Sequence, residues 1–96
     1  MNTISVREVL NLNNPIIVDI RNAYYYSMGH IVGAINIPYY NLLNNYSHYL
    51  NKYSIYYLYC DTGDKSILVV QRLNGLGYHL VNIEGGYLEY QKIFGS

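Results

Sequence analysis

The chain has 96 residues, of which 51% are hydrophobic and 12% charged, and its formal net charge is zero. This composition is typical of a globular chain that can bury one hydrophobic core, and it excludes a disordered segment. The absence of basic and acidic runs excludes the charge pattern of a nucleic-acid-binding protein. We therefore expect one domain over residues 1–96, with no nucleic acid among its partners.

Cysteine occurs once, as Cys60, and tyrosine fourteen times. A single cysteine excludes an intrachain disulfide and a cysteine-based zinc site, and three dispersed histidines do not have the spacing of a metal site. The first residues lack the pattern of a signal peptide, and no apolar run reaches membrane-spanning length. We expect a soluble cytoplasmic protein with no membrane partner. Because the tyrosines are scattered along the chain, we attribute their number to compositional bias and not to an aromatic binding face.

The N-terminal half predicts short elements that are separated by turns. Ser5 and Glu8 have the spacing of a capping box, so a helix is expected to begin at Val6. It must end before Pro15, because the residue before a proline disfavours helix. The further expectations for this half are an end of that helix near residue 11, a buried strand at 16–20, a loop with one helical turn over 21–31, a strand at 34–38 and an amphipathic helix over 40–51.

The C-terminal half alternates strands with helices. The expected elements are a strand at 54–59, a turn at 61–64, a helix beginning at Lys65, a strand at 78–83, a turn at 84–86 and a helix from 87 to about 94. This alternation predicts an α/β fold with a central, mostly parallel sheet flanked by helices. Ligands of such sheets bind beyond the carboxyl ends of the strands, which is where Cys60 falls.

Cys60 directly follows a buried strand and precedes a helix. A cysteine is nucleophilic only as the thiolate, and a free thiol is mostly protonated at neutral pH. A helix that begins near Lys65 would offer unpaired backbone N–H groups and the positive end of its dipole to an anion at the sulfur. By position alone, a reactive cysteine and a small buried apolar residue are equally good interpretations.

Several motifs together resemble the rhodanese family. The segment Cys60-Asp61-Thr62-Gly63-Asp64-Lys65-Ser66 is similar to the pattern C-x-x-G-x-R-S, with Lys65 in the arginine position. The segments 18–21 (VDIR), 29–38 (GHIVGAINIP), 76–78 (LGY) and 83–87 (IEGGY) resemble the family's other signatures, in the same order and with similar spacing. The match covers about residues 3 to 91. The sequence departs from the family pattern at Tyr25, which stands directly before the aromatic Tyr26, in a position where the family often has an acidic residue.

The resemblance implies a rhodanese-like sulfurtransferase in which Cys60 attacks a sulfane sulfur and becomes a persulfide. The donor would be thiosulfate or a persulfide, the acceptor a thiol or cyanide, and neither a metal nor an organic cofactor is required. The backbone of the loop residues would surround the persulfide, and two residues near the sheet would support it. The loop residues are Asp61, Thr62, Gly63, Asp64 and Lys65, and the supporting residues are Asp19 and Arg21, for which we favour a structural role.

Two alternatives remain open. Rhodanese-fold phosphatases and arsenate reductases resemble the same pattern but have a loop one residue longer than the six residues from Cys60 to Lys65, so sulfur transfer is the better fit. A non-enzymatic binding or regulatory module is the second alternative. It is motivated by Asp61 and Asp64, whose charges would disfavour a thiolate and repel dianionic thiosulfate.

Overall fold

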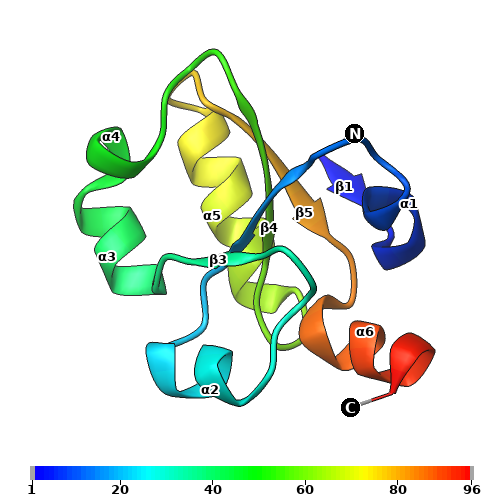
Figure 1. Cartoon of the computed structure of the whole chain (residues 1–96). Helices are drawn as coiled ribbons and strands as arrows, with labels where there is room; N and C mark the ends of the chain where they lie inside the picture. Colours follow the sequence, from blue (N-terminus) through cyan, green and yellow to red (C-terminus); the bar gives the residue numbers. More distant parts are fainter. Residues whose placement is uncertain (1, 96) are drawn as a thin grey trace.

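The computed structural model describes residues 2–95, which form a five-stranded sheet with helices on both faces (Figure 1). All strand pairs are parallel, in the order β1-β5-β4-β2-β3. The strands are β1 (Thr3–Ile4), β2 (Ile16–Asp19), β3 (Ile35–Asn36), β4 (Ile55–Tyr59) and β5 (His79–Ile83). The helices are α1 (Val6–Leu10), α2 (Ala23–Met28), α3 (Tyr39–Asn44), α4 (Tyr46–Tyr49), α5 (Asp64–Asn74) and α6 (Gly86–Phe94). The predicted α/β class is confirmed.

Two apolar cores lie on opposite faces of the sheet. Successive side chains of β4 point to opposite faces, so Leu58 and Cys60 join the core on one side while Tyr59 joins the core on the other. The first core packs against α3, α4 and α5, and the second against α1 and α6, as Figure 1 shows. The inner strands are therefore covered on both faces, which agrees with the apolar runs seen in the sequence.

The chain changes direction across the sheet between β2 and β4. From β2 it runs to the edge strand β3, and from β4 it runs the other way to β5, so β2 and β4 are neighbours from which the chain departs in opposite directions. A crevice forms at such a point, at the carboxyl ends of the strands. Register places Asp19 of β2 beside Tyr59 of β4, directly before Cys60.

The first helix begins as predicted. The Ser5 side chain accepts a hydrogen bond from the Glu8 amide at 3.1 Å, and the Glu8 carboxylate accepts one from the Ser5 amide at 3.0 Å. Two N-terminal features differ from expectation. The two-residue strand β1 was not predicted, because its only reason to be extended is parallel pairing with β5. Helix α2 is longer than one turn, because Asn22 caps it by accepting from the Tyr25 amide.

The prediction of a single amphipathic helix over residues 40–51 is wrong. The segment forms the two short helices α3 and α4, which are separated at Asn45 (φ −142°, ψ 38°). Asparagine is a weak helix former, and Asn44 and Asn45 stand together at the break. The apolar spacing was nevertheless informative, since Leu42 is fully buried and Leu43 and Tyr46 pack against the same core.

None of these helices, over the part of the chain that the structure describes, has the length and apolarity needed to cross a membrane.

Helix α5 offers a matched pair of substitutions that tests its packing against the sheet. Leu73 is fully buried, whereas Leu68 on the same helix is 61% exposed. Leu73→Ala is expected to lower the free energy of unfolding by about 2–5 kcal/mol, because it removes buried methyl groups and leaves a cavity. Leu68→Ala is expected to change it by less than about 0.5 kcal/mol. Urea denaturation of both variants measures this, and equal losses would contradict the packing described.

Candidate active site

Cys60 lies at the end of β4 with its sulfur facing the start of α5. Its Sγ accepts a hydrogen bond from the Gly63 amide at 3.2 Å and lies 3.5 Å from the Ser66 hydroxyl. Gly63 has a left-handed backbone (φ 99°), and this conformation, which favours glycine, turns its amide back toward the sulfur. The loop thus brings one backbone donor to Cys60, the Gly63 amide, which would stabilise negative charge on the sulfur.

A glycine turn from the next strand holds the Cys60 loop in place. The amide of Tyr87 donates to the Cys60 carbonyl at 2.9 Å, and that of Leu88 donates to the Asp61 carbonyl at 3.0 Å. A Cβ atom at Gly86 (φ 61°) would collide with both carbonyl oxygens, so the close approach requires glycine there. Gly85 and Gly86, expected to form a tight turn near the loop, begin α6 and support the back of the loop.

Behind the sulfur lies a buried polar pair. Ser66 is fully buried, and its hydroxyl contacts the Asn82 side-chain oxygen at 2.5 Å and the Gly63 carbonyl at 3.3 Å. Asn82 is itself buried on β5. This pair fixes the orientation of the hydroxyl beside Cys60. Ser66 was seen in the sequence only as the last residue of the loop motif, and Asn82 had no signal apart from its place in a strand.

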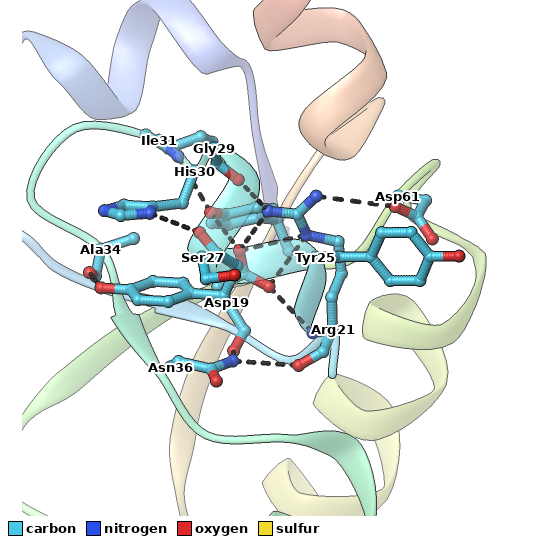
Figure 2. Close-up of polar contacts among 12 residues, drawn as sticks. Asp19, Arg21, Tyr25, Ser27, Gly29, His30, Ile31, Ala34, Asn36 and Asp61 are labelled. Atoms are coloured by element: carbon cyan, nitrogen blue, oxygen red, sulfur yellow. Dashed lines mark hydrogen bonds and ion pairs between the residues drawn. The ribbon is translucent and has the colours of Figure 1, made fainter. Parts of the chain in front are cut away.

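Asp19 is the centre of a second buried network, drawn in Figure 2. Its carboxylate accepts hydrogen bonds from the Arg21 amide at 2.8 Å and from the Arg21 guanidinium, whose closest nitrogen lies at 2.7 Å. It also accepts from the Tyr59 hydroxyl at 2.6 Å. Arg21 in turn donates to the Gly29 carbonyl at 2.6 Å, and the Ile31 amide donates to the Tyr59 hydroxyl. Asp19 and Arg21 therefore join the strand ends to the loop that follows α2.

The guanidinium of Arg21 makes contacts beyond Asp19 and Gly29. It lies over the Tyr87 ring at 4.1 Å from the centroid, and its remaining nitrogen is 3.9 Å from the Asp61 carboxylate. Burial works against the charged form of Arg21, but hydrogen bonding to Asp19 and the charge of Asp19 outweigh burial, so the pKa of Arg21 is raised above its usual value. Arg21 is thus a permanent cation that Asp19 holds in place, and Nη1 is the guanidinium nitrogen that remains for further contacts at the cavity.

A cavity of about 300 Å³ opens beside the cysteine, at the crevice between β2 and β4. We call it the Cys60 cavity. Its wall consists of residues that follow β2, β3 and β4 and of one residue of α2, namely Ile20, Arg21, Asn22, Tyr25, Pro38, Tyr39, Tyr40, Asn41, Cys60, Asp61 and Lys65. The predicted residues Cys60, Asp61, Lys65 and Arg21 thus meet at one cavity, and its three tyrosines were not predicted as site residues.

The charged residues of the loop point in different directions. The Asp61 side chain is 71% exposed and faces Arg21. Lys65 places its ammonium 5.2 Å from the centre of the Tyr39 ring, and Asp64 lies exposed in the first turn of α5. Solvent screens exposed charges strongly, so the acidic loop disfavours a thiolate less than its sequence alone indicates. Thr62 is exposed as well, and among residues 61–65 only Gly63 donates its amide to the sulfur.

His30 lies away from the cysteine. Its ring stacks on Tyr26 at 3.8 Å between centroids, and its Nδ1 lies 2.8 Å from the Tyr26 carbonyl oxygen. The residue secures the loop after α2. His48 and His79 are exposed.

These features define a parallel α/β domain with a cysteine cradled between a strand end and a helix start. The model of the rhodanese-like domain matches residues 4–93, so the chain belongs to the rhodanese-like domain family. Among solved structures, a protein from Staphylococcus saprophyticus is 38% identical, with a TM-score of 0.84 over 94% of this chain and 93% of that one. A rhodanese-related protein from Thermoplasma volcanium is 25% identical, with a TM-score of 0.89 over 100% of this chain and 96% of that one.

Two curated relatives have different printed functions. The adenylyltransferase and sulfurtransferase uba4 of Ogataea parapolymorpha is 31% identical over 93% of this chain and 23% of the relative. The tRNA uridine(34) hydroxylase of Buchnera aphidicola is 29% identical over 88% of this chain and 29% of the relative. The match covers 23% of the length of the first relative and 29% of the second, so the chain spans about a quarter of each. The resemblance therefore concerns one part of those proteins.

Removal of the Asp19 charge tests the buried network. Asp19→Asn keeps the shape of the side chain but leaves Arg21 buried without its counter-ion, so the free energy of unfolding is expected to fall by about 3–5 kcal/mol. Glu84→Gln, which neutralises an exposed carboxylate, is the matched control and is expected to change it by less than about 0.5 kcal/mol. Urea denaturation at neutral pH measures both. A loss for Asp19→Asn no larger than that of the control would contradict the network.

The hydroxyl of Tyr59 makes stability depend on alkaline pH. Burial, followed by the hydrogen bond to Asp19 and the charge of Asp19, raises the pKa of Tyr59 well above its usual value of 10.0. Because the pKa of Tyr59 is higher in the folded protein than in the unfolded chain, the contribution of Tyr59 to the free energy of unfolding is complete below pH 10. This contribution is lost as the pH rises further, because Tyr59 ionises first in the unfolded chain. The stability advantage of wild type over Tyr59→Phe is therefore expected to shrink between pH 9.5 and 11 in urea denaturation, by about 1.4 kcal/mol per pH unit above pH 10. A stability difference between wild type and Tyr59→Phe that stays constant over this pH range would contradict the prediction. Tyr53→Phe, which removes a fully exposed hydroxyl, is the control and is expected to show no such pH dependence relative to wild type.

Proposed function

We propose that the chain is a sulfurtransferase domain that receives a sulfane sulfur on Cys60 as a persulfide and passes it to a thiophilic acceptor. The donor is thiosulfate or a persulfide, and the acceptor is a thiol or cyanide. The observation that carries the proposal is the hydrogen bond of 3.2 Å from the Gly63 amide to the Cys60 sulfur. It lies in a loop typical of the family, beside the Cys60 cavity.

The reaction has two balanced steps. The Cys60 thiolate attacks the terminal sulfur of the donor, and a new S–S bond forms at Sγ while the old S–S bond breaks. The electron pair of the broken bond leaves with sulfite when the donor is thiosulfate, or with a thiolate when it is a persulfide. In the second step the acceptor attacks the outer sulfur, and the electron pair returns to Cys60. No oxidant or reductant is consumed, and the two half-reactions follow the double-displacement scheme of covalent catalysis.

The surroundings of Cys60 suit an anionic sulfur. The Gly63 amide donates to the sulfur at the start of α5, where the N-terminal end of the helix dipole favours negative charge. Cys60 also lines the Cys60 cavity, from which a donor can approach. With no second cysteine in the sequence, the persulfide is discharged by an outside acceptor and not by an internal disulfide.

Replacement of the nucleophile tests the function. Wild-type protein with thiosulfate or methanethiosulfonate, and cyanide as acceptor, is expected to form thiocyanate. Before cyanide is added, its mass is expected to rise by about 32 Da, one sulfur atom on the thiolate. Cys60→Ser, nearly isosteric, is expected to lose at least about a thousandfold in rate and to show no added mass, because the hydroxyl is a far weaker nucleophile.

Three outcomes would contradict the proposal. Thiocyanate formation by Cys60→Ser at the wild-type rate would exclude Cys60 as the nucleophile. Failure of the wild type with every donor, together with a Cys60 that iodoacetamide alkylates only at alkaline pH, would favour the non-enzymatic binding module. Hydrolysis of an aryl phosphate that requires Cys60 would favour the phosphatase alternative.

A further inference from the structure

We infer that Asn82 is a positioning residue for Cys60. It takes the only proton of the Ser66 hydroxyl and so presents Ser66 to the sulfur as a hydrogen-bond acceptor. An acceptor favours the thiol over the thiolate, so Asn82 sets, through Ser66, the pH at which Cys60 becomes nucleophilic. The inference concerns the site of the proposed function, but the reactivity of the thiol is measured without any transfer of sulfur.

Ser66 and Asn82 form a polar pair in an otherwise apolar part of the molecule. Side chains of β5 alternate between the two faces of the sheet, so Asn82 points to the same side as Leu80, which belongs to the core packed against α5. Ser66 is fully buried and Asn82 is 5% exposed. Polar side chains at such positions are costly unless they are hydrogen-bonded, and an apolar pair of similar shape packs equally well. Packing alone therefore does not account for the pair.

The Ser66 hydroxyl has one proton and two oxygen acceptors near it. The Asn82 side-chain oxygen lies at 2.5 Å and the Gly63 carbonyl oxygen at 3.3 Å. The Gly63 carbonyl already accepts the Ile67 amide at 3.1 Å. The contact to Asn82 is therefore the stronger hydrogen bond, because it is much the shorter of the two. The proton of Ser66 is directed at Asn82 and not at Cys60.

This arrangement leaves a lone pair of the Ser66 oxygen facing the sulfur. Ser66 Oγ is 3.5 Å from Cys60 Sγ, and the thiol can donate its S–H to that oxygen. The thiolate has no proton to donate, so negative charge on sulfur would face the lone pairs of an oxygen. A hydrogen bond to the neutral form of a group disfavours its charged form. Ser66 thus opposes the Gly63 amide, which donates to the sulfur and favours the thiolate.

Asn82 prevents the hydroxyl from reversing its direction. If Ser66 turned its proton toward the sulfur, the side-chain oxygen of Asn82 would lose that donor inside the protein, and a buried acceptor without a partner is unfavourable. With an apolar residue in place of Asn82, the hydroxyl is free to donate to a thiolate. The effect of Asn82 on Cys60 is therefore transmitted through Ser66.

Other titratable groups surround Cys60, and the substitutions below leave all of them in place. They are Asp19 and Arg21 at the end of β2, Tyr25 of α2, Tyr39 and Tyr40 of α3, Tyr59 of β4, Asp61 of the loop, Asp64 and Lys65 of α5, and Glu84 and Tyr87 after β5. A change in the titration of Cys60 in these variants therefore reports on the Ser66–Asn82 pair.

The experiment measures the rate at which iodoacetamide alkylates Cys60 in the full chain. Between about pH 5 and 10 this rate follows the fraction of thiolate, so the midpoint of its rise reports the balance of thiol and thiolate. Ser66→Ala removes the acceptor, and Asn82→Leu frees the proton of Ser66. Each is expected to lower the pH midpoint by about one unit relative to the wild type.

The double variant Ser66→Ala/Asn82→Leu is expected to have the midpoint of Ser66→Ala alone, because Asn82 acts through Ser66. Asn74→Leu is the matched control. This asparagine lies at the other end of α5, where it accepts from the Leu80 amide at 2.7 Å and donates to the Leu80 carbonyl at 2.9 Å. Its loss is expected to weaken the fold without moving the midpoint. Thermal melts establish that each variant is folded, and if Asn82→Leu does not fold, Ser66→Ala alone decides the sign.

Four results would overturn the inference. A midpoint that rises in Ser66→Ala would mean that Ser66 donates to the thiolate, and an unchanged midpoint in Asn82→Leu would mean that Asn82 does not direct the hydroxyl. Additive shifts in the double variant would mean that Asn82 acts on Cys60 by another route, and an equal shift in Asn74→Leu would attribute the effect to lost stability. All four are independent of thiocyanate formation, whose absence in the wild type would instead overturn the proposed function.

Discussion

The site depends on the hydrogen bonds and the ion pair that the buried carboxylate of Asp19 forms. A fully buried carboxylate is costly unless every acceptor position is used, and Asp19 accepts from the amide and guanidinium of Arg21 and from the hydroxyl of Tyr59. These bonds join the ends of β2 and β4 side by side. Since Cys60 follows Tyr59 directly, the network that neutralises Asp19 also fixes where Cys60 emerges from the sheet.

The same network limits which groups can act on the Cys60 sulfur. Because Nε and Nη2 of Arg21 are bonded to Asp19 and to the Gly29 carbonyl, the donors beside the sulfur are the Gly63 amide and the start of α5. These donors are rigid, since the glycine turn at Gly86 holds the carbonyl side of the loop from behind. Fixed dipoles that need no reorganisation are the efficient means of stabilising charge in a reaction.

Much of this arrangement could be predicted from the sequence. Signals local in the chain were read correctly: the capping box at Ser5 and Glu8, the strand that ends at Cys60, and the loop motif after it. Features that depend on tertiary contacts were missed, because β1 exists only through its pairing with β5 and the break at Asn45 interrupts a continuous apolar pattern. The Ser66–Asn82 pair and the cavity tyrosines join residues distant in sequence, and no local pattern indicates such a meeting.

The tyrosines differ in their roles in the structure. Their abundance alone favoured the interpretation of a compositional bias, and Tyr53, which is fully exposed at a turn, agrees with that interpretation. Tyr59 and Tyr87, however, enclose the Arg21 guanidinium and so belong to the structural network. Tyr25 stands where the family often has an acidic residue, and this exchange removes a negative charge from the cavity mouth and adds an aromatic surface there. Tyr25 therefore adds a half-exposed aromatic ring, and no charge, to the wall of the Cys60 cavity.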